Sequence, residues 1–297
     1  MKQILRHCYY LFALCFSKAV LLLPFRTAVR CGGVLGFLGY YAIGSTRKLT
    51  QKHLRRAFPE KTEGEINSLA RTVFINQGKN AFELFSFPKL DKDALFSVVS
   101  VQNKEVFEQA LAKGKGVLIA SAHCGNWEIM GAALSQSGFP INVIARRIYI
   151  EGLNAMLVGF RTSKGVRVIL RSGQESARGI LRSIRHNESI GILIDQDTSV
   201  PGVFVDFFGH PAWTPSGLTT LALKTGAVVV LALDIRRPDD THTVCISGPI
   251  EMTKSDDHEK DIIENTQRIT KHIEDHVRAH PEQWVWMHER WKTQRQG

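Results

Sequence analysis

The first fifth of this chain lacks acidic side chains. Residues 1–59 hold no Asp or Glu, and the first acid of the 297-residue sequence is Glu60. The same segment has ten Lys and Arg residues, whereas the rest of the chain holds 28 basic and 28 acidic residues, so the formal charge of +10 belongs to the N-terminal segment. Basic residues interleaved with apolar runs indicate a surface for anionic membrane lipids. No nucleic-acid binding motif accompanies the charge, so a nucleic-acid partner is not expected.

Cysteine is scarce and has no recognisable spacing. The five cysteines are an odd number, lie far apart and form no CxxC pair, so a disulfide framework or a zinc site is not expected and a reducing compartment fits. The chain also lacks a GxSxG elbow, which disfavours a serine hydrolase. The segment "GKG" at 114–116 lacks the rest of a phosphate-binding loop.

Long uninterrupted apolar runs are absent as well. The segment 8–24 is near the lower length limit for a spanning helix and is broken by Lys18, and the segment 31–44 is too short to span alone. Residues 1–45 are therefore predicted to form membrane-anchoring helices, either one short spanning helix or two helices lying in the interface. Two buried core helices are the alternative. The flanking Arg and Lys residues favour the membrane and place these flanks on its cytoplasmic side.

The rest of the chain, 46–297, reads as an α/β domain with a helical lead-in over 46–100. Short β-rich runs then alternate with helical segments, which predicts a mostly parallel central sheet flanked by helices on both faces. Strands are expected at 117–121, 141–145, 166–170, 190–195, 203–208, 227–233 and 243–247. Helices are expected at 126–137, 151–164, 174–186, 215–225 and 259–280.

One histidine stands at the end of a predicted strand. His123 follows the run 117–121, Gly125 allows a sharp bend, and Glu128 lies in the first turn or so of the next helix. Sites in open α/β sheets form outside the carboxyl ends of the strands. A carboxylate on one imidazole nitrogen raises the basicity of the other, so the spacing predicts His123 as a general base oriented by Glu128. Cys124 is adjacent, but neighbours in an extended segment point in opposite directions, which disfavours a cysteine nucleophile.

Further polar residues follow other predicted strands. Asp195 and Asp197 flank Gln196 at another predicted strand end and are expected to share a face of the sheet with His123. Paired aspartates can hold a divalent cation, but no third ligand has suitable spacing, so no metal is expected. Some residues of a basic run are expected to line the rim of the same cleft, where the planar guanidinium group of Arg suits phosphate groups. The run comprises Arg146, Arg147, Arg161, Lys164, Arg167 and Arg171. Three tryptophans in "PEQWVWMHERWK" are interpreted as packing or interface anchors.

Taken together, "AHCGNWE", "DQD…FFG" and "PEQWVWMHERW" resemble the late acyltransferases of lipid A synthesis. These lauroyl and myristoyl transferases belong to the lysophospholipid acyltransferase superfamily, and the resemblance covers almost the whole chain. His53 stands where Asn is usual ahead of "L..AFP", and Glu289 where Arg is frequent, which leaves the subfamily open.

The resemblance implies a bacterial enzyme on the cytoplasmic face of the inner membrane. It would move a fatty acyl chain from acyl carrier protein, or less often coenzyme A, to a hydroxyl of a glycolipid, without a cofactor. His123 would be the general base, Glu128 its orienting partner, Arg161 a substrate-binding residue, and Asp195 a further site residue. Arg146, from the basic run, is the other residue expected to bind substrate. Alternative acceptors are a lysophospholipid, a phosphoinositol mannoside or an ornithine lipid. A non-enzymatic membrane-surface protein that binds acidic partners is the remaining alternative.

Overall fold

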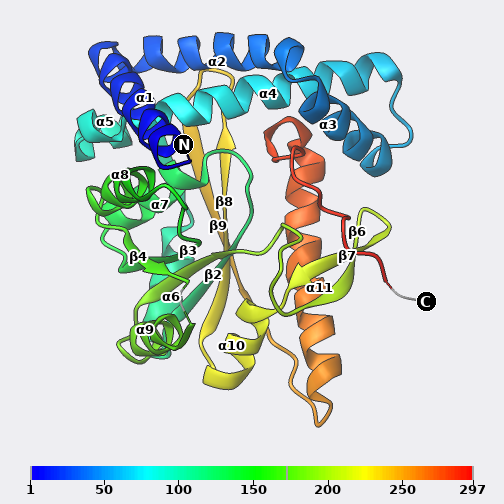
Figure 1. The fold of residues 1–297 in the computed structure, drawn as a ribbon. Helices are drawn as coiled ribbons and strands as arrows, with labels where there is room; N and C mark the ends of the chain where they lie inside the picture. Colours follow the sequence, from blue (N-terminus) through cyan, green and yellow to red (C-terminus); the bar gives the residue numbers. More distant parts are fainter. Residues whose placement is uncertain (1, 172, 296–297) are drawn as a thin grey trace.

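The protein is described from a computed structural model that covers residues 2–171 and 173–295. Helices dominate the first third and strands follow (Figure 1). The helices are α1 (Lys2–Leu22), α2 (Phe25–Ala42), α3 (Gly44–Ala57), α4 (Glu63–Phe85), α5 (Lys92–Phe96), α6 (Lys104–Ala112), α7 (Trp127–Gln136), α8 (Glu151–Thr162), α9 (Gly173–Arg185), α10 (Gly217–Thr225) and α11 (His258–Ala279), with short 3₁₀ turns η1 (Phe87–Lys89) and η2 (Pro281–Gln283). The strands are β1 (Val99–Gln102), β2 (Val117–Ser121), β3 (Ile141–Ala145), β4 (Arg167–Leu170), β5 (Ser189–Leu193), β6 (Gly202–Phe207), β7 (His210–Pro215), β8 (Val228–Arg236) and β9 (His242–Ile250).

A seven-stranded sheet forms the centre of the molecule. Its order is β1-β9-β8-β2-β5-β3-β4, and every pair is parallel except β8 with β9. All five residues of β2 are buried, as expected for a central strand covered on both faces. The predicted α/β class with a mostly parallel sheet is confirmed.

Each face of the sheet has its own apolar core. Successive side chains of a strand point to opposite faces. Leu118 of β2 accordingly packs in the core that α10 and α11 cover, and Ile119 packs in the core that α6 and α7 cover. This layering explains why the helical and strand periodicities alternate along the sequence.

Three strands differ from the expected pattern. The segment around 203–208 does form a strand, β6, but it pairs antiparallel with β7 in a separate hairpin that lies along α11. Gln267 of α11 fixes this hairpin, because its side chain accepts from the backbone N–H of Asp206 and donates back to that residue's carbonyl. β1 and β7 have no strong apolar signature and were not predicted from the pattern.

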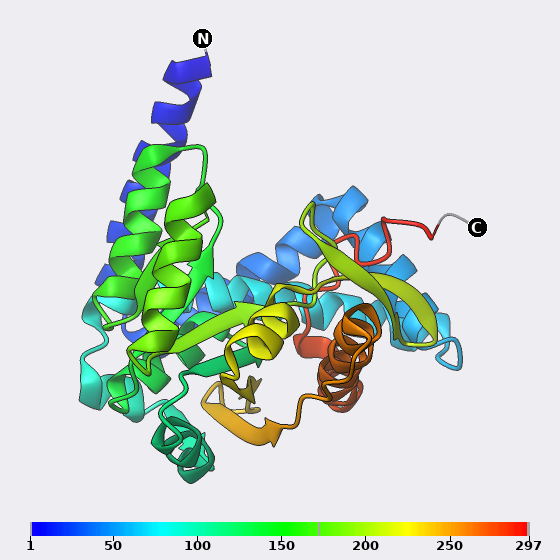
Figure 2. The same ribbon diagram turned by 90° about the horizontal axis from the view of Figure 1, so that it is seen from below.

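The N-terminal helices lie against one edge of this core. α2 runs along α4, and Gly36 and Gly78 let the two backbones approach so closely that a Cβ at either position would collide with the other helix. α1 projects beyond the rest of the protein (Figure 2). Among the described residues it contains the one helical window, Leu5–Leu22, that is long and apolar enough to cross a membrane, and only 11% of that window is buried.

Candidate active site

The carboxyl ends of two central strands bring His123 and Asp195 together. His123 lies two residues after β2 and Asp195 two residues after β5. These strands are parallel neighbours, so their ends meet at the same edge of the sheet, where ligand sites of open α/β sheets form.

The carboxylate of Asp195 holds His123 in a fixed orientation. Asp195 Oδ1 lies 2.9 Å from His123 Nδ1, and Asp195 Oδ2 accepts from the backbone N–H of His123 at 2.9 Å. Trp284 Nε1–H donates to the same Oδ2 at 2.7 Å. A carboxylate at Nδ1 favours the tautomer with the proton on that nitrogen, which leaves the Nε2 lone pair free to take a proton.

The pKa of Asp195 is lowered despite its burial. The Asp195 side chain is 1% exposed and that of His123 is 20% exposed. Burial raises the pKa of the carboxyl, but the charge of His123 and the hydrogen bonds from His123 and Trp284 together lower it below its usual value. Asp195 is therefore ionised at neutral pH and can stabilise a positive charge that forms on His123.

Glu128 has a different partner from the one its spacing predicts. The spacing predicts that the Glu128 carboxylate accepts a hydrogen bond from the His123 imidazole, but in the structure the Asp195 carboxylate lies at His123 Nδ1. Glu128 instead forms a bidentate ion pair with Arg161 of α8. Arg161 Nε donates to Glu128 Oε2 at 2.9 Å, and Arg161 Nη2 donates to Glu128 Oε1 at 2.5 Å. Both side chains are mostly buried. The reason is geometric: Glu128 lies in the first turn of α7, which packs partly against α8, whereas Asp195 follows β5, the strand next to the one that precedes His123.

The loop that carries His123 is clamped by buried polar groups. Gly125 has φ +58°, and a Cβ there would collide with the backbone of Asp234. Asn126 begins α7 with its side chain accepting from two backbone N–H groups, while its own N–H donates to Asp234 Oδ2 at 2.7 Å. Asn126 Nδ2 donates to Glu83 at 2.6 Å, and Asn80 Nδ2 donates to the Gly125 carbonyl at 2.7 Å. The bend that aims His123 is thus fixed from α4 and β8.

Behind this loop lies a buried charge network of Glu83, Asp234, Arg236 and His242. Glu83 accepts two hydrogen bonds of 2.6 Å from Arg236, and His242 Nδ1 lies 2.7 Å from Asp234. Burial lowers the pKa of His242, but the charges of Asp234 and Glu83 outweigh it and raise the pKa to about 10. Burial likewise raises the pKa of Glu83, but His242 and Arg236 hold it at about 2. Two positive and two negative groups therefore balance one another inside the protein.

The chain's C-terminal segment closes the site from behind. The Val285 N–H donates to the His123 carbonyl and the Gly125 N–H donates to the Gln283 carbonyl, both at 3.0 Å. Cys124 lies between these bonds and is 1% exposed. Burial, with the charges of Asp234 and Asp195, raises the pKa of its thiol well above the usual value. Cys124 is therefore not an activated nucleophile.

A groove of about 640 Å³ opens over His123. Its walls are mostly apolar, with Trp127 beside the imidazole at a ring-centroid distance of 4.8 Å. Three of the six predicted basic residues line it: Arg146, Arg161 and Arg171. The groove thus combines apolar walls with guanidinium groups suited to phosphate.

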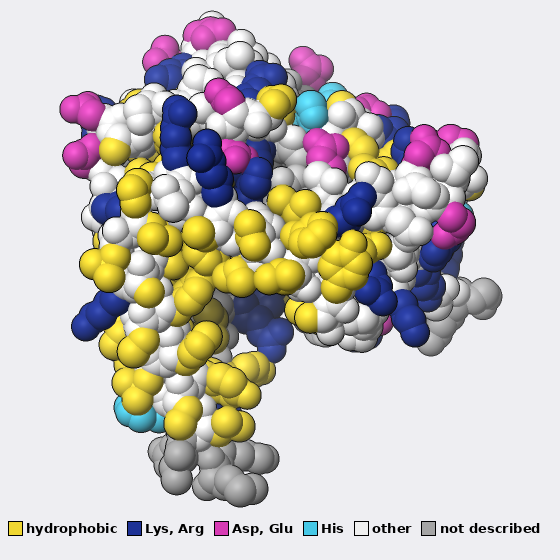
Figure 3. Space-filling view, turned by 90° about the horizontal axis from the view of Figure 1, so that it is seen from above, with side chains coloured by type: hydrophobic (Ala, Val, Ile, Leu, Met, Phe, Trp, Pro, Cys, Tyr) yellow, Lys and Arg dark blue, Asp and Glu magenta, His cyan; other side chains and the backbone are white. Residues whose placement is uncertain are grey.

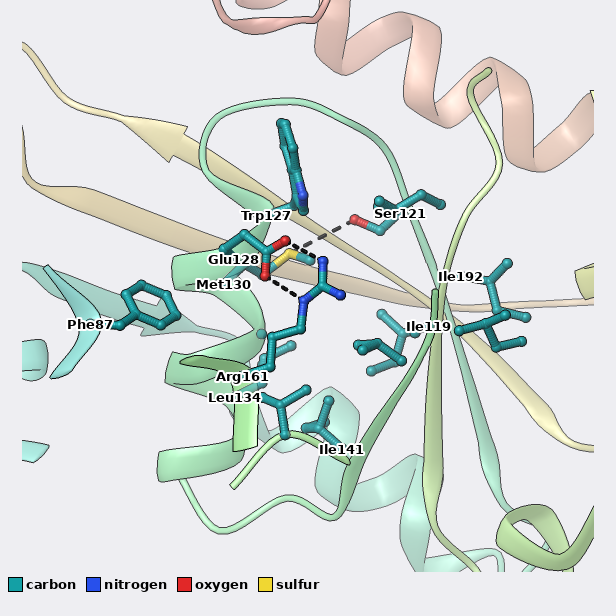
Figure 4. Close-up of a pocket in the computed structure, with 16 residues that line it drawn as sticks. Phe87, Ile119, Ser121, Trp127, Glu128, Met130, Leu134, Ile141, Arg161 and Ile192 are labelled. Carbon is teal, nitrogen blue, oxygen red and sulfur yellow. Dashed lines mark hydrogen bonds and ion pairs between the residues drawn. The ribbon is translucent and has the colours of Figure 1, made fainter. Parts of the chain in front are cut away.

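A second, more apolar cavity adjoins this groove between the sheet and α7. Figure 4 shows Arg161 and Glu128 bonded to each other in it, with Phe87, Leu134, Ile141 and Ile192 among the surrounding apolar side chains. Residues that line both spaces are Trp127, Ile144, Arg161, Ile192 and Leu193. The Arg161–Glu128 pair therefore lies where the His123 groove meets the apolar cavity.

The other predicted residues have structural partners. Lys164 is buried and donates to the Leu90 carbonyl, and Arg167 pairs with Glu188 at 2.6 Å. Asp197 accepts from the N–H and hydroxyl of Thr293 at 2.7 and 2.9 Å, so it fixes the C-terminal segment. Within residues 2–171 and 173–295, no group of three His, Cys, Asp or Glu side chains is arranged to hold a metal ion.

Two site residues were missed in the sequence, Trp127 and Trp284. Trp127 lies inside the stretch "HCGNWE", so its place between His123 and Glu128 was a usable signal. The sequence pattern indicates a packing role for Trp284, and its ring is fully buried, but its Nε1–H also donates to Asp195. Nothing local in the sequence indicates this contact, because 89 positions separate the two residues.

Comparison with known proteins assigns the chain to a family. Residues 2–293 match the bacterial lipid A biosynthesis acyltransferases, so the chain belongs to that family and is an acyltransferase. The resemblance stated from the sequence motifs is confirmed.

Individual relatives fall into two groups. Phosphatidylinositol mannoside acyltransferase of Mycolicibacterium smegmatis is 29% identical over 66% of this chain and 66% of its own length. The Mycobacterium tuberculosis protein of the same name is 25% identical over 85% of this chain and 79% of its own. Lipid A biosynthesis lauroyltransferase of Escherichia coli is 23% identical over 94% of this chain and 89% of its own.

Proposed function

We propose that this acyltransferase moves a fatty acyl chain from an acyl thioester to a hydroxyl of a lipid A precursor or a related glycolipid. The observation that carries the proposal is the Nδ1 bond of His123 to Asp195, which leaves Nε2 facing the groove as a base. The donor is acyl carrier protein or, alternatively, coenzyme A. No cofactor takes part, because a thioester is already activated.

In the proposed reaction His123 Nε2 removes the proton of the acceptor hydroxyl as its oxygen attacks the thioester carbonyl. The tetrahedral intermediate then collapses, the C–S bond breaks, and the imidazolium returns its proton to the leaving thiolate. Asp195 stabilises the imidazolium between these two steps. Arg161, held by Glu128, and Arg146 bind phosphate or other polar groups of the substrates at the rim of the groove. Glu128 thereby acts on the site through Arg161.

The acyl chain is proposed to lie in the groove over His123 with its end in the apolar cavity beside Arg161, which has a volume of about 70 Å³. This cavity begins at the groove over His123 and continues between apolar side chains of α7 and the sheet. A hydrocarbon chain gains free energy by leaving water for such a space. Gly131 of α7 and Gly191 of β5 line the cavity and keep it open.

The N-terminal helices are proposed to hold the enzyme on the cytoplasmic face of a bacterial inner membrane. The spanning candidate in α1 is largely exposed, and α2 adds exposed apolar side chains. The residues that flank them are basic, which suits the cytoplasmic side. The division into an anchoring segment 1–45 and an acyltransferase domain 46–297 remains part of this proposal.

A phosphoinositol mannoside is the second candidate acceptor. It is favoured by the mycobacterial relatives, which are phosphatidylinositol mannoside acyltransferases and exceed the lauroyltransferase in identity. The fold and the proposed chemistry at His123 would be unchanged, since either acceptor would offer a hydroxyl.

Lipid mass spectrometry on a deletion strain tests both candidates. The deletion should remove one acyl chain from a glycolipid, and the wild-type gene but not His123→Ala should restore it. His186→Ala, at an exposed histidine outside the site, is the matched control and should restore it fully. Full restoration of the acyl chain by His123→Ala would overturn the proposal. If the deletion removed an acyl chain from phospholipid alone, the acceptor would instead be a lysophospholipid.

A further inference from the structure

The helix α2 has two dissimilar faces. One face packs on α4 through glycines, and the opposite face is apolar but exposed. Figure 3 shows these hydrophobic side chains as a band, with Lys and Arg side chains grouped beside one end of it. The exposed stripe consists of Val34, Leu35, Phe37, Leu38, Tyr41 and Ile43.

At the C-terminal end of this stripe lies a polar hollow of about 480 Å³, here called the basic hollow. It is formed where α2, α3 and α4 meet. Its lining includes three cations and no Asp or Glu: Tyr40, Tyr41, Arg47, Lys48, Gln51, Gly64, Asn67, Ser68 and Arg71. The two acids that flank Gly64 in the sequence are engaged elsewhere: Glu63 is paired with Arg55 at 2.6 Å, and Glu65 accepts from the Thr62 N–H at 2.8 Å.

The cations of the basic hollow are not neutralised within the protein. Among the residues that the structure describes, neither the Lys48 nor the Arg71 side chain has an ion pair or a hydrogen bond. Arg47 is positioned by donating one N–H to the Tyr40 carbonyl at 3.1 Å and by lying over the Tyr40 ring, which leaves its other N–H groups available. Gln51 and Asn67 are bonded to each other at 2.5 Å and give the hollow a fixed wall. Three clustered cations without counter-charges create a positive potential that attracts anions.

We propose that the basic hollow binds the phosphate-bearing headgroup of one anionic phospholipid, whose acyl chains lie along the apolar stripe of α2. Tyr41 belongs to both the stripe and the hollow, so the phosphate and chain positions are continuous. A free phosphate ion would use only the hollow, and an acidic protein would not need the exposed apolar stripe. The proposal rests on the proposed membrane location but not on the acyl-transfer chemistry at His123.

The test measures lipid binding to the full-length chain purified in a neutral detergent. Native mass spectrometry compares dioleoyl phosphatidylglycerol, dioleoyl phosphatidylcholine and inorganic phosphate. The wild type should retain one phosphatidylglycerol in preference to phosphatidylcholine, and millimolar phosphate should not displace it. The variant Arg47→Gln/Lys48→Gln/Arg71→Gln should bind phosphatidylglycerol about 100-fold more weakly, since each cation near an anionic lipid contributes roughly a fivefold factor.

A charge-matched variant, Lys92→Gln/Lys113→Gln/Lys115→Gln, removes three exposed lysines outside the hollow and should bind as the wild type does. If the triple variant of the hollow is unstable, Lys48→Gln/Arg71→Gln changes only the two unpaired cations and should still weaken binding. Equal loss in both charge variants, or complete displacement by phosphate, would overturn the proposal. The proposal would also be overturned if the triple variant of the hollow bound acyl carrier protein more weakly but bound lipid as the wild type does, because the hollow would then be a protein-docking site. Acyl transfer to a detergent-dispersed acceptor should persist in the hollow variants, which separates this proposal from that for His123.

Discussion

The imidazole of His123 and the carboxylate of Asp195 are 2.9 Å apart, although 72 positions separate the two residues in sequence. The contact arises because β2 and β5 are adjacent parallel strands that end at the same level. Asp195 is itself fixed by Trp284, so the imidazole proposed as the base is held by a carboxylate whose own position is fixed.

Replacing Asp195 by Asn should abolish most of the activity. Asp195 Oδ2 accepts two N–H bonds, so the amide oxygen of Asn takes that position and its NH₂ group faces His123. That group donates to Nδ1 and moves the imidazole proton to Nε2, the wrong tautomer for a base. We expect kcat to fall about 10²–10⁴-fold with a small change in KM. Asp256→Asn, at an exposed aspartate, is the control, and wild-type kcat in Asp195→Asn would contradict the assignment.

Glu128 and Arg161 should behave as one unit. If Glu128 acts through Arg161, either single change breaks the same ion pair. The double variant Glu128→Gln/Arg161→Gln should then have the same activity as the less active of the two single variants. Steady-state kinetics of both singles and the double measure this coupling. Multiplicative losses would instead show that Glu128 acts on His123 independently, as its spacing predicts.

Gly125→Ala should distort the loop that carries His123. The backbone there has φ +58°, and the added methyl group would collide with Asp234, so we expect a loss of at least about 1–3 kcal/mol in the free energy of unfolding together with activity. Gly114→Ala is the matched control, since Gly114 also has positive φ (+68°) but no atom within 4 Å of the added Cβ. If Gly125→Ala and Gly114→Ala were equally destabilised in thermal unfolding, the collision with Asp234 could not be the cause of the loss.

The buried charge network should limit stability at both extremes of pH. The folded pKa of His242, about 10, lies above its unfolded value of 6.5, so its contribution is complete below pH 6.5 and is lost as the pH rises towards 10. The folded pKa of Glu83, about 2, lies below its unfolded value of 4.5, so its contribution is present above pH 4.5 and is lost as the pH falls towards 2. The thermal midpoint should therefore be highest between about pH 4.5 and pH 6.5 and should decrease at lower and at higher pH. The alkaline decline should be weaker in His242→Gln, and an unchanged decline would assign it to other groups.

Filling the apolar cavity should shorten the preferred acyl chain. Gly131 lines this cavity, and the nearest atom to an added Cβ is 3.9 Å away, so Gly131→Leu adds bulk inside the space without a backbone collision. Competition between acyl thioesters of different length should shift towards shorter chains. Gly159→Leu places the same side chain on the exposed side of α8 and should leave the preference unchanged. An unaltered preference in Gly131→Leu would place the acyl chain elsewhere.

Much of the fold could be predicted because the helical and strand periodicities are clean. The run 117–121 is β2 to the residue, and the helix expected at 259–280 is α11 within one residue at each end. The pairing of strands was harder: β6 carries a strand pattern but leaves the main sheet, because Gln267 and the facing side of α11 bind it there. A local pattern reports which residues are extended and does not report their neighbours.

The sequence by itself determined that His123 lies at a strand end, followed by a glycine bend and a helix start, and that the basic surplus sits beside the most apolar helices. These are local properties, set by backbone periodicity and composition. Only the tertiary structure decided that Asp195 rather than Glu128 contacts the imidazole, that Glu128 binds Arg161, and that Trp284 reaches the site. Those partners depend on which strands lie side by side and on how α7 packs against α8. Contacts between segments that are remote in sequence are fixed only when the sheet and its two cores are assembled.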